Sequence, residues 1–194
     1  MKDFEIIDLT EETRHLIDAF SCVETDEFLE GFKSADRRRI KKHSKDMEDY
    51  LKIEAMDEQN MGLSKTYLLV SDGELIAYFS LCNDAVRLEF EERNELGFPY
   101  STIPAMKIAR LAVSTKHQRS GIGKAILQLS VLKALDVREH SGVALITLDC
   151  YEHRRSYYKR FGFIENLIQP VQLPYDSPIS MRLVIDDYLA KLGI

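Results

Sequence analysis

The sequence predicts an α/β fold, in which helices accompany a mixed β-sheet. The first third of the chain is polar, with apolar residues at helical spacing. After it, short β-branched runs alternate with amphipathic stretches, and Asp72-Gly73 gives a strong hairpin signal where the pattern changes. A chain of 194 residues is long enough to form one domain with a sizeable core.

The N-terminal third is expected to be helical. A short helix is predicted over 9–20, with Thr10 as its N-cap and acidic residues in its first turn. Thr25 is a plausible cap of a second short helix. A longer helix is predicted over 37–61, where apolar residues recur at helical spacing, and Gly62 ends it.

The remaining elements alternate strands with helices. Two strand-like runs flank Asp72-Gly73, and a charged, proline-containing connection follows over 83–104. After it we predict, in order, a strand over 107–113, a helix over 121–140, a strand over 143–149, a helix over 152–161 that stops at Gly162, and a strand over 178–185. This alternation is typical of a fold built around a mixed sheet.

The net charge of −6 hides one basic cluster. Residues 33–45 hold seven basic side chains against one acid, a local charge of +6, which leaves the rest of the chain at −12. RNA phosphates are one possible ligand, and a solvated helix face is the alternative because successive residues spread around a helix. The cluster includes Arg37, Arg38, Arg39, Lys41, Lys42 and Lys45.

Composition argues against several other classes of protein. No apolar run approaches the roughly 20 residues that cross a bilayer, and the N-terminus lacks the apolar core of a signal peptide. We therefore expect a cytoplasmic protein with no membrane partner. Cys22, Cys82 and Cys150 are too few and too far apart for a disulfide framework or a metal cluster, so small buried side chains are expected there. The histidines have no ligand spacing, and no metal is expected.

The stretch "HQRSGIGKAIL" is the strongest functional motif, because glycines and basic residues stand where a polar run becomes helical. This pattern is typical of an anion held on backbone amides at a helix start. A Walker loop would need Ser or Thr after Lys124, where the chain has Ala125. A dinucleotide fingerprint would need a glycine at Ile126. The sequence therefore favours neither an ATP loop nor a dinucleotide loop.

The strand, turn and helix around Gln118-x-x-Gly121-x-Gly123 resemble the pyrophosphate loop of the GNAT superfamily of N-acetyltransferases, which use acetyl-coenzyme A. Further along, "SYYKRFGF" is similar to the "FYxKxGF" element of that family. The resemblance covers about 65–185. It implies a mixed, mostly antiparallel sheet with a central splayed strand pair, flanked by helices, and the predicted helical N-terminus of this chain is an enlargement of that layout. We expect one acetyltransferase domain over 1–194, with a helical part over 1–64 and a CoA-binding core over 65–185.

The resemblance also implies roles for particular residues. Pantetheine would enter the gap between the two splayed strands, and Tyr158 would give a proton to the leaving CoA thiolate. Tyr157 would occupy the apolar position before it. The residues expected to bind acetyl-CoA are Leu111, Ala112, Val113, Gln118, Arg119, Ser120, Gly121, Ile122, Gly123 and Lys124.

The chain departs from the family where the acceptor amine is handled. It has Tyr151 and Arg154 where many members have Asn and Ala, and the strand over 107–113 lacks the usual carboxylate. The general base is therefore left open between a water chain and a glutamate of "RLEFEERNE", which is alternatively a solvated loop. We name Glu91, Glu92 and Arg110 as candidate substrate residues.

The acceptor also has alternatives. Acidic residues over 84–95 favour a cationic amine on a small molecule or a protein, so a general amine N-acetyltransferase ranks first. The layout is also similar to toxins of toxin–antitoxin pairs that acetylate charged tRNA, in which Arg110 matches an arginine. A non-catalytic acyl-CoA sensor is a third alternative. A homodimer is a possible partner state because dimers are common in the family.

Overall fold

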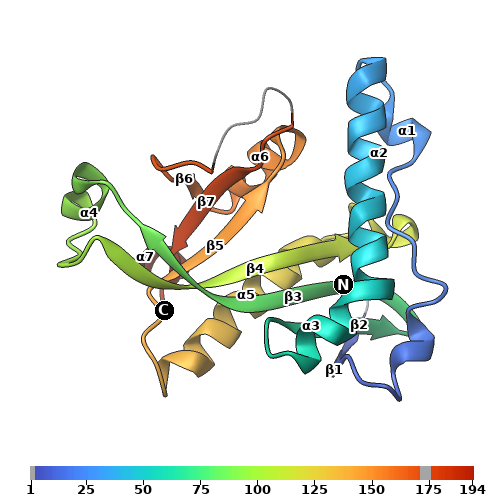
Figure 1. Cartoon of the computed structure of the whole chain (residues 1–194), viewed down its shortest axis with the longest axis horizontal. Helices are drawn as coiled ribbons and strands as arrows, with labels where there is room; N and C mark the ends of the chain where they lie inside the picture. The colour runs from blue at the N-terminus through green and yellow to red at the C-terminus, as the bar shows by residue number, and fades with distance from the viewer. Residues whose placement is uncertain (1–2, 171–175) are drawn as a thin grey trace. The chain divides into compact units, whose positions relative to one another are not determined.

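The computed structural model describes residues 3–170 and 176–194, and their strands form one seven-stranded sheet of order β1-β2-β3-β4-β5-β7-β6 (Figure 1). The contacts divide the chain into two compact units, Met1–Leu81 with Ala109–Gln128 and Cys82–Ile108 with Leu129–Ile194. The elements are β1 (Glu5–Asp8), α1 (Asp26–Leu29), α2 (Ser34–Asp49), α3 (Ala55–Asn60), β2 (Lys65–Ser71), β3 (Glu74–Arg87), α4 (Phe90–Glu95), β4 (Thr102–Val113), α5 (Ile122–Arg138), β5 (Leu145–Cys150), α6 (Glu152–Arg160), β6 (Ile164–Glu165), β7 (Ile179–Val184) and α7 (Ile185–Leu192).

In the first unit, β2 and β3 form the hairpin that the sequence predicts. Both turn residues adopt a left-handed backbone conformation, with φ of 53° at Asp72 and 75° at Gly73. Ser71 pairs with Glu74 to close the turn. Two positive φ angles define a type I′ turn, whose twist matches that of the flanking strands. β1 pairs antiparallel with β2 along its other edge.

The long helix predicted over 37–61 is confirmed. Helical structure is continuous through α2 and α3, and the segment between them, Tyr50–Glu54, has π-helical hydrogen bonding. Gly62 follows with φ of 73° and ends the stretch. Tyr50 joins the buried core of this unit together with Leu68 of β2 and Tyr78 of β3. The helix therefore covers the sheet of the first unit.

In the second unit, β4 and β5 are parallel, with Ala105–Ile108 beside Leu145–Leu148. β5 and β6 each pair antiparallel with β7. These pairings confirm the predicted mixed, mostly antiparallel sheet. β4 continues to Val113, beyond the last residue of its parallel register with β5.

The prediction of an irregular connection over 83–104 is wrong. β3 extends to Arg87, α4 follows, and β4 already begins at Thr102. The polar residues of this part of β3 alternate in exposure, as strand residues do, but their composition weakens the strand signal. α4 begins with a capping box made by Glu89 and Glu92, whereas the usual sequence signal has Ser or Thr at the first position.

The N-terminal part is less helical than predicted. The helix predicted over 9–20 is only a 3-10 turn at Arg14–Leu16. The Thr10 and Thr13 side chains bond each other's backbone amides, and this local pairing competes with an α-helix. β1 was not predicted, nor was α7, which follows β7 without a glycine or proline to mark the boundary. The second short helix is confirmed as α1.

The helices of the C-terminal half are confirmed in α5 and α6. After α6, Gly162 has φ of 98°, which favours glycine, and an added Cβ would lie 3.4 Å from the Leu183 side chain. None of the three cysteines forms a disulfide bond; Cys22 and Cys150 are buried as predicted, whereas Cys82 is only partly buried.

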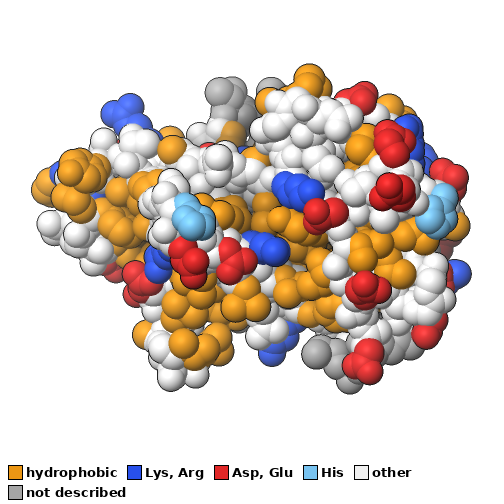
Figure 2. All heavy atoms as spheres, turned by 90° about the horizontal axis from the view of Figure 1, so that it is seen from below, with side chains coloured by type: hydrophobic (Ala, Val, Ile, Leu, Met, Phe, Trp, Pro, Cys, Tyr) orange, Lys and Arg blue, Asp and Glu red, His pale blue; other side chains and the backbone are white. Residues whose placement is uncertain are grey.

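Within the described residues, no helix combines the length and apolar character needed to cross a membrane. Over the same part of the chain, no group of three or more His, Cys, Asp and Glu side chains is placed to hold a metal ion. Figure 2 shows hydrophobic side chains spread among charged ones over one face. The exposed apolar side chains include Met61, Leu63 and Leu132. Apolar atoms contribute much of any protein surface, so this distribution needs no ligand to explain it.

Candidate active site

The loop between β4 and α5 carries the motif that the sequence singles out. A short 3-10 turn at Thr115–His117 follows β4, and α5 begins at Ile122. Gly121, the residue before α5, has φ of 91°. An added Cβ there would meet no atom within 4 Å, so the position requires glycine for its conformation and not for space.

The first turn of α5 supplies amide donors. Ala125 N bonds the Gly121 carbonyl at 3.1 Å, so the amides of Ile122, Gly123 and Lys124 precede the first bond within the helix. α5 has 17 residues, long enough for a positive N-terminal end. Lys124 is exposed at this end. Together these groups can hold an anion such as a pyrophosphate.

The loop is anchored on the segment before α1. The Thr115 amide donates to the Ser21 carbonyl at 2.8 Å, and the Thr115 hydroxyl donates to the Val23 carbonyl at 2.9 Å. Gln118 Nε2 donates to the Cys22 carbonyl at 3.2 Å. The side chain of Gln118 thus holds the loop in shape. Every residue predicted to bind acetyl-CoA, from Leu111 to Lys124, belongs to the first unit.

Tyr158, the predicted catalytic residue, lies on α6 in the second unit. Its ring packs edge-on against Tyr157, with centroids 5.3 Å apart, and against Phe163, with centroids 5.8 Å apart. Among the described residues, the Tyr158 hydroxyl has no hydrogen-bond partner. The aromatic contacts therefore hold the ring without using its hydroxyl.

Burial raises the pKa of Tyr158 well above its ordinary value of 10.0, although the Arg154 charge opposes this effect. Burial also raises the pKa of Tyr157. Tyr158 is therefore protonated at neutral pH, as a proton donor must be. Arg154 stands where many family members have a small residue, and sequence reasoning gave it no role; four positions before Tyr158 on α6, it lies on the same face of the helix.

The acidic candidates lie in different environments. Glu92 is buried, and its carboxylate accepts from Arg182 Nη1 at 2.5 Å, the Leu167 amide at 3.0 Å and the Glu89 amide at 3.0 Å. These bonds occupy the Glu92 carboxylate, which joins α4 to β7. Glu91 is exposed.

Arg110, the third candidate substrate residue, lies on β4 in the first unit. Its guanidinium carbon is 4.5 Å from the centre of the Tyr50 ring, and Arg110 Nη1 donates to the Ala109 carbonyl at 2.9 Å. Tyr50 begins the π-helical segment. The stacking of the Arg110 guanidinium on the Tyr50 ring fixes the Arg110 side chain, which is still partly exposed.

Sequence reasoning did not predict an ion pair that joins β4 to β5. Lys107 Nζ bonds Asp149 Oδ2 at 2.6 Å, and the Thr147 hydroxyl donates to Asp84 at 2.6 Å. Burial alone would lower the pKa of Lys107, but the bond to Asp149 and the charges of Asp149 and Asp84 outweigh burial and raise it. The parallel register places Lys107 beside Thr147, which no local sequence pattern could reveal.

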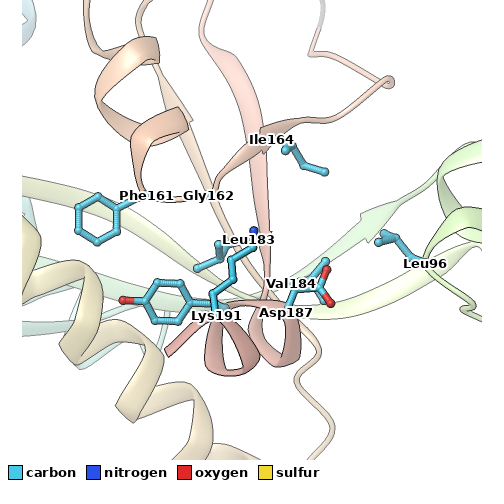
Figure 3. A pocket seen from close by; sticks show the side chains of 9 residues that line it. Leu96, Phe161, Gly162, Ile164, Leu183, Val184, Asp187 and Lys191 are labelled. Carbon is cyan, nitrogen blue, oxygen red and sulfur yellow. The ribbon is translucent and has the colours of Figure 1, made fainter. Parts of the chain in front are cut away.

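A small pocket of about 90 Å³ lies in the second unit between the end of α6, β7 and α7 (Figure 3). Leu96, Phe161, Gly162 and Lys191 are among its lining residues, and Tyr158 is not. Its volume is far below the roughly 300 Å³ at which ligand pockets begin. The pocket is therefore not a substrate site.

Comparison with known proteins agrees with this geometry. Residues 63–165, more than half of the chain, match the family described as "Acetyltransferase (GNAT) domain". A "tRNA-acetylating toxin" of Mycobacterium tuberculosis strain H37Rv is 22% identical over 149 residues, which cover 76% of this chain and 84% of the toxin.

Two solved structures show the same fold. AtaT complexed with acetyl-methionyl-tRNAfMet has a TM-score of 0.73 at 15% identity, over 99% of this chain and 100% of AtaT. A tyrosine-to-phenylalanine mutant of the AtaT toxin, bound to the C-terminus of the antitoxin AtaR and acetyl-CoA, has a TM-score of 0.64 at 14% identity, over 100% of both chains.

The family match confirms the predicted GNAT fold and the predicted acyl-CoA-dependent N-acetyltransferase, with acetyl-CoA as co-substrate. The predicted similarity to the tRNA-acetylating toxins is confirmed as well. The chain belongs to the GNAT family of acetyltransferases.

Proposed function

We propose that this protein moves the acetyl group of acetyl-CoA directly to a primary amine, with Tyr158 as the general acid. The observation that carries the proposal is the environment of the Tyr158 side chain. Aromatic packing fixes its ring, the described residues leave its hydroxyl without a partner, and burial keeps it protonated.

The reaction needs one proton donor and one proton acceptor. The amine nitrogen attacks the thioester carbonyl, a carbon–nitrogen bond forms and the carbon–sulfur bond breaks. The CoA sulfur leaves as a thiolate and takes the proton of the Tyr158 hydroxyl, which regains a proton from solvent. A phenol with a raised pKa is a weak acid, so its hydrogen bond to the developing thiolate stabilises charge before the proton moves. The amine loses its proton to water or to a carboxylate.

The phosphates of acetyl-CoA would bind at the loop before α5. The amides of Ile122, Gly123 and Lys124 and the positive end of the helix suit a pyrophosphate. Leu111, Ala112 and Val113 supply the strand backbone for the pantetheine arm, as the resemblance implies.

For the acceptor, we propose the amino group of an aminoacyl-tRNA, ahead of a general small-molecule or protein amine. The sequence alone ranks these in the opposite order; the change rests on the toxin relative and on the AtaT complex. The basic cluster supports the change. Within the described residues, Arg38 and Lys42 form no ion pair, and they stand four positions apart, on one face of α2.

Three of the other basic residues of α2 are partly neutralised by ion pairs, and Arg37 Nε donates to the Phe32 carbonyl at 2.8 Å. Lys41 pairs with Asp26 at 2.7 Å, Lys45 pairs with Asp49 at 3.0 Å, and Arg39 pairs with Asp36. An unpaired cation can bind a phosphate directly, whereas a paired cation must first give up its ion pair with a carboxylate. Arg38 and Lys42 are therefore the residues of this cluster that we assign to RNA.

Thiol release from acetyl-CoA tests the proposal with four acceptors: charged tRNA, the same tRNA after deacylation, a polyamine and a peptide with a free N-terminus. We expect release with charged tRNA only. Release with the polyamine or the peptide alone would restore the general amine acceptor. Binding of acetyl-CoA without release for any acceptor would favour the sensor.

A further inference from the structure

Arg119 has an unusual conformation for a residue at the edge of the proposed acetyl-CoA site. Its φ is 62°, in the left-handed region that is strained for a non-glycine residue. The side chain is exposed, and within the described part of the chain it forms no ion pair or hydrogen bond. A long cationic side chain in that situation would normally be free to rotate.

Phe28 of α1 restricts this side chain. The Arg119 guanidinium carbon lies 4.7 Å from the centre of the Phe28 ring. A guanidinium that stacks on a ring uses its face and leaves its edge N–H groups for a phosphate. The contact therefore orders Arg119 without using its donors.

Phe28 is itself held in place. Thr25 Oγ1 accepts the Phe28 amide at 3.3 Å, and the Phe32 ring lies 5.8 Å from the Phe28 ring. Leu29, the next residue, is fully buried and anchors α1. The hydrogen bonds from Thr115 and Gln118 join the segment before α1 to the loop. The ring and the loop thus belong to one bonded assembly in the first unit.

We infer that Phe28 is a positioning residue, which stacks on Arg119 and holds its guanidinium ready for a phosphate group of CoA. The inference rests on the proposed acetyl-CoA site. Nothing in the sequence pattern of the loop identifies Phe28, which is about 90 residues away from it. The chemistry needed is a phosphate oxygen facing the edge of a stacked guanidinium, and CoA offers this at its pyrophosphate and at its 3′-phosphate.

A double-mutant cycle on CoA affinity, measured by calorimetry, tests the inference. Phe28→Leu should weaken CoA binding about fivefold, the value of an exposed cation–π contact. Phe28→Trp should keep the wild-type affinity, because it restores a ring. In the Arg119→Ala background, Phe28→Leu should change affinity by less than about twofold. An equal loss with and without Arg119 would overturn the inference.

Two controls separate positioning from folding. Phe90→Leu removes a similar contact, in which the Arg93 guanidinium lies 5.4 Å from the Phe90 ring, and should leave CoA affinity unchanged. Arg119→Lys reaches the same contact without altering α1, so it tests the stacking even if Phe28→Leu fails to fold. It should weaken CoA severalfold because an ammonium lacks the planar fork. Unchanged affinity in Arg119→Lys would overturn the inference.

A comparison of CoA with 3′-dephospho-CoA shows which phosphate group of CoA binds the Arg119 guanidinium. If the 3′-phosphate is the partner, Phe28→Leu weakens CoA and spares 3′-dephospho-CoA. If the pyrophosphate is the partner, both ligands weaken equally. A wild-type protein that binds no CoA would overturn the proposed function itself. A wild-type protein that binds CoA and transfers acetyl groups, with Phe28→Leu unchanged, would overturn only this inference.

Discussion

Replacing Tyr158 with phenylalanine removes a single oxygen atom, the one assigned to protonate the CoA thiolate. Stability should change little, because the described residues give the hydroxyl no hydrogen bond to lose. The ring contacts with Tyr157 and Phe163 are kept. The variant therefore isolates the chemical role of the hydroxyl from its packing.

The expected loss is in kcat. A positioned general acid contributes roughly 10²–10⁴-fold to rate, or about 2.7–5.4 kcal/mol of barrier. Because the raised pKa of Tyr158 makes it a weak acid, the lower end, about 10²-fold, is expected. Affinity for acetyl-CoA should stay within about twofold, because we propose that the phosphates bind at the loop before α5. Steady-state thiol release and calorimetry measure the two quantities separately.

The pH profile gives a second test of Tyr158. An acid is effective below its pKa, and burial raises this pKa above 10.0, so the loss of the acid form falls above pH 10. Below that, the rate should rise with pH as the α-amino group of the acceptor, with an ordinary pKa of about 8, becomes neutral. A fall in kcat between pH 7 and pH 9 would mean that another group is the acid.

Tyr157→Phe is the matched control, since it removes a hydroxyl from the neighbouring residue. Its kcat should stay within about threefold of the wild-type value, because Tyr157 is assigned no proton transfer. The reasoning about Tyr158 is refuted if Tyr158→Phe keeps more than about a third of the wild-type kcat. It is also refuted if both variants lose the same activity.

Further variants test the loop, the core and the basic face. Gly121→Ala should weaken CoA about tenfold through strain at φ of 91°, whereas Gly97→Ala, with φ of 69° in the second unit, should lower the melting temperature without changing CoA affinity; equal CoA affinities would contradict this role. Arg182→Leu leaves a buried carboxylate unpaired and should lower the melting temperature by roughly 10 °C in a thermal melt, and an unchanged melt would exclude a stabilising pair. Arg38→Glu with Lys42→Glu should raise KM for charged tRNA at least about tenfold and reduce its salt dependence while CoA affinity stays constant; an unaltered KM would remove these residues from RNA binding.

Local signals in the sequence predict much of the fold. The Asp72-Gly73 turn, the long helical stretch of α2 and α3, and the strand, loop and helix around Gly121 all depend on residues close in the chain. The elements that escaped prediction lack such signals. β1 has only four residues, and the capping box of α4 begins with Glu89 in place of Ser or Thr.

The site shows the same limit. Sequence reasoning named Tyr158 and the loop glycines as candidates because the family motifs contain them. It also named Glu92 as a substrate residue, and the Arg182 pair that occupies this carboxylate comes from a strand 90 positions away. Lys107 with Asp149, and Phe28 with Arg119, likewise meet only in the folded chain. Pairs of this kind follow from tertiary packing and not from local spacing.

The most direct test of the central claim identifies the bond that carries the acetyl group after incubation of the wild-type protein with labelled acetyl-CoA and a mixture of charged tRNAs. The tRNA is then isolated and its ester hydrolysed in alkali, and the released amino acids are analysed by mass spectrometry. We predict N-acetyl amino acids that carry the label, reduced about 10²-fold when Tyr158→Phe replaces the wild-type protein for the same short time. Label that remains in acetyl-CoA, or appears only as free acetate, would contradict the account.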